Sequence, residues 1–180
     1  MKDKYTKPYH LAYVKNKFKL MGSRYYIPLR LLKSVIKQIT KVSRSVYVLD
    51  SGGGEGALIY ALLKVLRPHI LADLYIVNLD INLNALKFAK QIMRSLRYEC
   101  CTFDLIHADV QYPPFRKDAF DIITSLEVIE HVDDDKAYLK SLIQTTKKYV
   151  ILTTPRFLGY IRSEEHKREY SYKSLSLIHI

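Results

Sequence analysis

The chain contains little cysteine: two residues in 180, at the neighbouring positions Cys100 and Cys101. Adjacent cysteines rarely meet the geometry of a disulfide, and neither has a CxxC partner or a nearby histidine at metal-ligand spacing. We therefore expect no disulfide framework and no metal site. Isolated cysteines of this kind are typical of core or loop residues in a reducing compartment.

A long apolar run is also missing. No segment approaches the roughly 18 uninterrupted apolar residues of a membrane span. The first ten residues, MKDKYTKPYH, contain no apolar stretch resembling a signal peptide. These absences argue against a membrane partner and favour a cytoplasmic protein. With 48% hydrophobic residues, the chain is long enough for one domain with a real core and short for two.

Acidic residues are scarce in the N-terminal quarter. Within residues 1–45, Asp3 stands against 12 Lys and Arg, so this quarter carries the whole formal net charge of +11. Aromatic side chains alternate with the lysines, a composition suited to phosphates and stacked bases. Two interpretations of the arm at residues 1–24 stay open. It binds RNA or an anionic metabolite, or it is a solvated basic arm with a few aromatics packed on the domain.

Apolar periodicity divides residues 25–180, which we assign to a single domain, into alternating helix-like and strand-like segments. Helices are expected at residues 27–41, 56–68, 82–97 and 133–148. Strands are expected at residues 45–50, 74–80, 102–109, 120–128 and 149–155. Repeated βαβ units predict an α/β fold with a Rossmann-like, doubly wound and mostly parallel sheet, covered by helices on both faces. Ligands then bind at the carboxyl ends of the strands.

Four glycines follow the first predicted strand, in the segment VLDSGGGEGA. A bare backbone there lets a ligand approach closely, and the next helix points its N-terminal amides at the ligand. The spacing Gly52-x-Gly54-x-x-Ala57 also fits the dinucleotide pattern, which leaves a nicotinamide oxidoreductase as an alternative. However, Asp50 directly before the glycines would repel a pyrophosphate and attract a positively charged ligand.

Six ordered blocks resemble the class I S-adenosylmethionine-dependent methyltransferases, in their small-molecule, type 11-like branch. VLDSGGGEG is similar to the first motif of that family, with Asp50, Gly52, Gly54 and Gly56 at its acid and glycine positions. Gly53 is unusual there and is expected to add flexibility. VNLDIN and HADV resemble the ends of strands two and three, and FDIITSLEVIEHV the strand-four region. YVILTTP and EEHKREYSYKSL resemble later blocks, so the likeness covers about residues 25–175.

The resemblance implies S-adenosyl-L-methionine as the cofactor and an enzyme that transfers its methyl group to an unidentified acceptor. This cofactor is a sulfonium cation without phosphate, so acids should line its site. The resemblance assigns the ammonium end to Asp50, the two ribose hydroxyls to Asp80 and the adenine face to Ile81. Each acid has an alternative interpretation as a helix cap or turn residue.

The resemblance also assigns the remaining contacts of the cofactor. Asp109 would accept a hydrogen bond from the adenine amino group, and the Val110 amide would address a ring nitrogen. The backbone around Ser125, Leu126 and Glu127 would close over the methionine end.

Two histidines are candidates for the catalytic step. A hydroxyl acceptor must lose a proton, and His131 or His166 would serve as the base or bind the acceptor. Structural roles are the alternative for both.

The chain departs from the family after the fifth predicted strand. The family sheet usually has seven strands, and residues 156–180 are too few for another helix and two strands of ordinary length. Strands six and seven are therefore expected to be missing or abbreviated, with an open sheet edge that a homodimer would cover. This departure keeps a second hypothesis open: a non-catalytic or partner-completed S-adenosylmethionine-binding subunit.

Overall fold

The structure is a computed structural model that describes residues 24–66, 73–96, 101–155 and 166–171. Of the basic arm expected at residues 1–24, Arg24 lies within the described residues. The residues in which strands six and seven would be sought, beyond position 155, are described only at 166–171. None of the helices in the described ranges has the length and apolarity that crossing a membrane requires.

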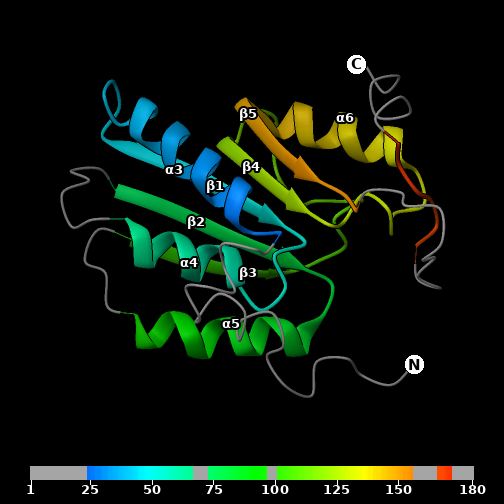
Figure 1. The fold of residues 1–180 in the computed structure, drawn as a ribbon, viewed down its shortest axis with the longest axis horizontal. Helices are drawn as coiled ribbons and strands as arrows, with labels where there is room; N and C mark the ends of the chain where they lie inside the picture. Colours follow the sequence, from blue (N-terminus) through cyan, green and yellow to red (C-terminus); the bar gives the residue numbers. More distant parts are fainter. Residues whose placement is uncertain (1–23, 67–72, 97–100, 156–165, 172–180) are drawn as a thin grey trace.

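Helices and strands alternate along the described residues as the periodicity predicts. The helices are α3 (Tyr26–Ile39), α4 (Ala57–Val65), α5 (Leu83–Ser95) and α6 (Asp135–Thr145). The strands are β1 (Ser45–Ser51), β2 (Asp73–Asp80), β3 (Cys101–His107), β4 (Phe120–Leu126) and β5 (Thr146–Thr153). They form one sheet in the order β3-β2-β1-β4-β5 with parallel neighbours (Figure 1). The prediction of a Rossmann-like parallel sheet is confirmed.

Helices cover both faces of this sheet. On one face, α3 and α4 share a core cluster with side chains of β1, β2 and β4, and Met93 of α5 joins it. On the other face, Tyr138 and Leu142 of α6 pack with Leu49 and Ile123. The segment between β3 and β4 forms turns instead of a helix. Within the described residues, α6 is therefore the helix of the second face, and β3 and β5 are the sheet edges.

The boundary between α6 and β5 differs from the prediction. The helix expected at 133–148 ends at Thr145, and β5 begins at Thr146, three residues before the expected start. Lys147 belongs to the strand, where its ammonium group contacts Asp121 Oδ1 at 3.1 Å. Lys147 therefore lies outside the last turn of α6, and its partner is on the neighbouring strand β4.

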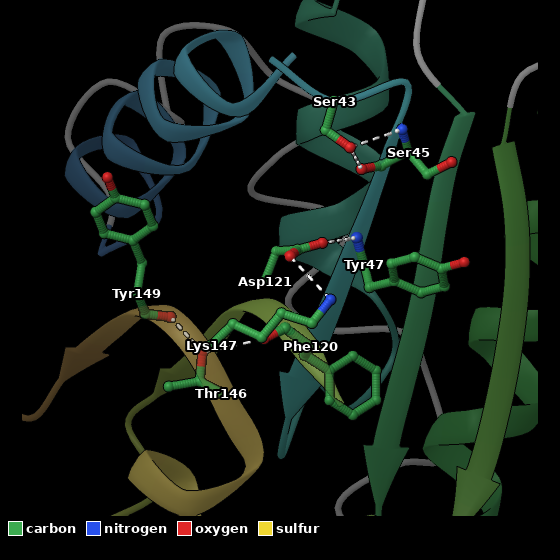
Figure 2. A network of polar contacts seen from close by, with 8 residues as sticks. All are labelled: Ser43, Ser45, Tyr47, Phe120, Asp121, Thr146, Lys147 and Tyr149. Carbon is green, nitrogen blue, oxygen red and sulfur yellow. Dashed lines mark hydrogen bonds and ion pairs between the residues drawn. The ribbon is translucent and has the colours of Figure 1, made fainter. Parts of the chain in front are cut away.

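Asp121 joins three strands at the amino end of the sheet. One carboxylate oxygen accepts the Tyr47 amide of β1 at 2.9 Å, and the other contacts Lys147 of β5 (Figure 2). The β4–β5 register shifts between Phe120 and Ile122, at the position of Asp121 itself. The nearly buried carboxylate therefore supplies an acceptor for a strand amide at the start of the β1–β4 pairing.

Replacing Asp121 should destabilise the sheet through the Tyr47 amide and only weakly through the ion pair. Asp121→Ala leaves that amide without its acceptor and should lower the free energy of unfolding by about 1–3 kcal/mol. Lys147→Ala removes a partly exposed ammonium group and should cost about 0–1 kcal/mol. Asp121→Asn keeps an acceptor oxygen and should fall between the two variants. Urea denaturation measures all three, and equal losses for Asp121→Ala and Lys147→Ala would contradict this account.

Candidate cofactor site

The glycine segment makes a tight turn between the end of β1 and the start of α4. Gly52, Gly54 and Gly56 all have positive φ, between 53° and 75°, a region that side chains other than glycine rarely adopt. The Gly52 amide donates to the Leu79 carbonyl of β2 at 2.8 Å, which ties the turn to the neighbouring strand. The three glycines of the motif are therefore required by the path of the backbone.

Gly53 is required for a different reason. A Cβ atom at this position would lie 2.4 Å from Asn78 Oδ1 and 2.5 Å from Asp50 Oδ2. The turn passes directly over these two side chains, so position 53 has no room for a side chain. The expectation that Gly53 adds flexibility overlooked this close approach, which depends on the polar residue at position 78.

Asp50 lies beneath the turn, in the middle of the sheet. It pairs in register with Asn78 of β2 on one side and Thr124 of β4 on the other. The Thr124 hydroxyl donates to its Oδ1 at 2.7 Å, and Oδ2 has no hydrogen-bond partner within the described residues. Burial raises the pKa of Asp50 to about 7, partly offset by the Thr124 hydrogen bond. Asp50 is thus a buried carboxyl group with one oxygen that has no hydrogen-bond partner within the described residues.

Asp80, the last residue of β2, accepts hydrogen bonds from the glycine turn after β1 and from the loop that follows β2. Its Oδ2 accepts the Gly54 amide at 2.8 Å and its Oδ1 accepts the Asn82 amide at 2.7 Å. Burial raises its pKa, and the two amides lower it. Each carboxylate oxygen keeps a second lone pair for a ligand hydroxyl. Ile81, the next residue, is 66% exposed, an unusual position for a large apolar side chain beside a buried acid.

Asp109 closes a turn after β3. Its Oδ1 accepts the Gln111 amide at 2.9 Å, and the Asp109 carbonyl accepts the Tyr112 amide at 3.1 Å. Asp109 therefore makes the contacts of a turn residue, which was the alternative interpretation of this acid. Val110 packs against the core cluster of the second face. Both residues are partly exposed at the carboxyl edge of the sheet.

Successive side chains at the end of β4 point to opposite faces of the sheet. The buried Ser125 hydroxyl bonds to the Tyr138 hydroxyl of α6 at 2.9 Å, and Ser51 at the end of β1 bonds to the same hydroxyl at 3.0 Å. Burial raises the pKa of Tyr138 to about 12. Leu126 packs against the cluster of the opposite face. Tyr138 thus fixes the relative positions of the β1 and β4 ends.

Glu127 follows β4 and meets the start of α3. It has a positive φ of 58°, which is uncommon outside glycine and typical of strained positions at functional sites. Its carboxylate lies 3.7 Å from the Arg24 guanidinium. Burial raises the pKa of the neighbouring Tyr25, and the charges of Asp50 and Glu55 add to the rise. The sequence placed Arg24 in the basic arm and Tyr25 among the aromatics that alternate with the lysines, and the structure brings both to this edge.

The two candidate histidines meet in space. The rings of His131 and His166 lie edge to face with their centroids 4.9 Å apart. Glu130, which the sequence analysis did not single out, has its Oε1 4.0 Å from His131 Nε2. The segment 166–171 is tied to this region because the Lys167 amide donates to the Glu130 carbonyl at 2.8 Å. The sequence feature that could have pointed to Glu130 is the VIEH segment of the strand-four block, which places an acid directly before His131.

Comparison with known proteins places this arrangement in a family. A family model described as methyltransferase domain matches residues 42–174. The chain belongs to this family. Ubiquinone biosynthesis O-methyltransferases from strains of Coxiella burnetii are 32% identical to this methyltransferase domain over 110 residues, which are 61% of this chain and 42% of theirs. The chain thus spans less than half the length of these curated relatives.

Solved structures share the fold. A SAM-dependent methyltransferase from Aquifex aeolicus matches 96% of this chain and 85% of its own, with a TM-score of 0.64 and 16% identity. The small RNA methyltransferase HEN1 matches 81% of this chain and 21% of its own, with a TM-score of 0.63 and 23% identity. The predictions of a methyltransferase domain and of a Rossmann-like fold are confirmed.

The stability of the protein should depend on pH through Asp50. Because burial raises the pKa of Asp50 from 3.8 to about 7, the folded chain binds more protons than the unfolded chain between these values. The free energy of unfolding therefore falls as the pH rises through this window. Asp50→Asn removes the titration. Its stability relative to wild type should increase by roughly 2–3 kcal/mol between pH 5 and pH 8.

Urea denaturation at the two pH values measures this difference. Asp73→Asn provides the control, because Asp73 is an exposed acid at the start of β2, at the opposite end of the strand from the site. Its stability relative to wild type should be the same at both pH values. A pH-independent difference for Asp50→Asn would contradict a buried carboxyl group that is neutral at pH 5.

Proposed function

We propose that the chain binds S-adenosyl-L-methionine at the carboxyl ends of β1 to β4 and catalyses methyl transfer to an acceptor. The observation that carries the proposal is the series of acids at this edge. Asp50 has an oxygen without a partner in the described part of the chain, and Asp80 is aligned by two backbone amides. This donor set suits a cation with a ribose and has no phosphate-binding lysine in the glycine turn. It argues against the nicotinamide alternative.

In this proposal, each group of residues contacts a different part of the cofactor. Asp50 attracts the ammonium group from beneath the turn, and Asp80 accepts from the ribose hydroxyls. Ile81 packs on the adenine, with Asp109 and Val110 at its edge. The backbone of Ser125, Leu126 and Glu127 borders the methionine end. When bound, the cofactor supplies a methyl group already activated by its sulfonium, so the protein has mainly to align the acceptor and exclude water.

Ile81 offers a sharp test because it is 66% exposed and supports no buried part of the fold. Ile81→Ala removes apolar area that the adenine would cover and should weaken S-adenosylmethionine and S-adenosylhomocysteine about tenfold. Val42→Ala is the matched control, since Val42 is 81% exposed and precedes β1 at the opposite edge of the sheet. Isothermal titration measures both affinities, and thermal unfolding without ligand should be unchanged in both variants.

The same titrations test the alternatives. NAD should produce no binding heat and no thermal stabilisation, whereas S-adenosylmethionine at 100 times its dissociation constant should stabilise by about 2.7 kcal/mol. Binding of NAD in place of the sulfonium would overturn the proposal. Equal affinities of Ile81→Ala and wild type would remove Ile81 from the site.

For the acceptor we propose a small molecule that is methylated on oxygen. The supporting observation is the likeness to ubiquinone biosynthesis O-methyltransferases. RNA or an anionic metabolite held by the basic arm is the second candidate, supported by the +11 charge of residues 1–45. A homodimer over the β5 edge and a cytoplasmic location stay predictions. A non-catalytic, cofactor-binding role is the remaining hypothesis, and any turnover to S-adenosylhomocysteine would exclude it.

Salt dependence separates the two acceptor classes. If the arm binds RNA through phosphates, the affinity for a single-stranded RNA of about 20 nucleotides should fall at least tenfold between 50 and 200 mM salt. Release of S-adenosylhomocysteine with a small hydroxyl-bearing molecule and none with RNA would support the small-molecule acceptor. Fluorescence anisotropy and a product assay give the two readouts. RNA binding that does not weaken with salt would contradict an electrostatic role for the arm.

A further inference from the structure

Three metal-ligating side chains converge beyond the end of β4. Glu130 and His131 lie in the turn after the strand, and His166 comes from a segment 35 residues further along the chain. One ligand atom from each residue lies within 4.8 Å of the other two. None of the three belongs to the residues assigned to the cofactor, although His131 and His166 are the two histidines considered above for the catalytic step.

Glu130 is the unusual member of the cluster. The residue is 1% exposed, and neither carboxylate oxygen has a hydrogen-bond partner within the described residues. Burial raises its pKa and the negative charge of Glu127 raises it further, whereas His131 and the nearby Thr154 hydroxyl lower it. A buried carboxylate without hydrogen bonds is costly unless a cation compensates it. The carboxylate points toward the imidazole of His131, with 4.0 Å between Oε1 and Nε2.

The position of His166 is secured by its neighbours. The Arg168 guanidinium donates to the carbonyls of Val132 and Asp133, and the Tyr170 hydroxyl donates to Asp135 at 2.8 Å. Lys167 pairs with Asp133 through its side chain, in addition to its amide bond to the Glu130 turn. These contacts hold the segment 166–171 against the turn after β4. The imidazole is therefore preorganised beside Glu130 and His131.

We propose that Glu130, His131 and His166 bind a divalent transition-metal cation. Two imidazoles and one carboxylate suit Zn²⁺, Mn²⁺, Co²⁺ or Fe²⁺, whereas Mg²⁺ and Ca²⁺ prefer sites made only of oxygen. Metal bonds of about 2.0–2.2 Å place ligand atoms roughly 3–4 Å apart, so the cluster needs only a small contraction. Three protein ligands leave positions for water or a substrate oxygen.

Titration with Co²⁺ tests the site directly. Untagged full-length protein is treated with a chelator, desalted and titrated with Co²⁺, whose visible absorption reports the coordination. One equivalent should bind saturably, and Zn²⁺ should displace it. Glu130→Gln and His166→Ala should each weaken Co²⁺ binding at least tenfold. Thermal unfolding without metal shows whether each variant is folded, and because the two variants alter different segments, one remains informative if the other unfolds.

Matched controls use the same residue types nearby. His107→Gln changes an exposed histidine at the end of β3, and Glu169→Gln changes an acid in the segment of His166 that is not part of the cluster. Both should bind Co²⁺ as wild type does. Absence of saturable binding of Co²⁺, Zn²⁺ and Mn²⁺, or unchanged affinity in both cluster variants, would overturn the proposal. The readout needs no cofactor, so its outcome is independent of the methyl-transfer proposal.

Discussion

The buried carboxylate of Asp50 is the constraint around which the site is arranged. It lies in the middle of the polar row that Asn78, Asp50 and Thr124 form across three adjacent strands. The glycine turn lies so close above it that position 53 has no room for a side chain. A single hydrogen bond from Thr124 does not compensate its burial, which raises its pKa to about 7. The site thus contains a buried carboxyl group, that of Asp50, whose second oxygen suits a cationic ligand.

The other functional groups lie around this centre because parallel strands end on one side. Asp50 and Asp80 lie at the carboxyl ends of β1 and β2, Glu127 directly follows β4, and Arg24, which precedes α3, reaches Glu127 from a distant part of the sequence. Tyr138 joins the ends of β1 and β4 through two hydroxyl contacts. The cofactor-binding groups therefore lie on rigid strand ends. The histidine cluster of the proposed metal site lies beside them, on the turn after β4 and on the segment 166–171.

Much of this arrangement could be predicted, for identifiable reasons. Strands of apolar and β-branched residues and amphipathic helices give periodic patterns, so every described helix and strand was expected in order. The α6–β5 boundary was misplaced because Lys147 pairs with Asp121 of another strand. Leu83, the first residue of α5 after its N-cap Asn82, is 49% exposed, although apolar spacing alone would place it on the buried face with Leu86. Such errors arise where a contact outside the element decides the outcome.

By itself, the sequence determined the fold class, the family and the strand ends at which acids would gather, since these depend on local periodicity and on short motifs. Only the tertiary structure decided what surrounds each group. It placed Glu130 in a buried position without hydrogen bonds among the described residues and set His166 beside His131. The sequence alone could not show this, because burial and the contact between residues 35 positions apart arise only when the chain packs.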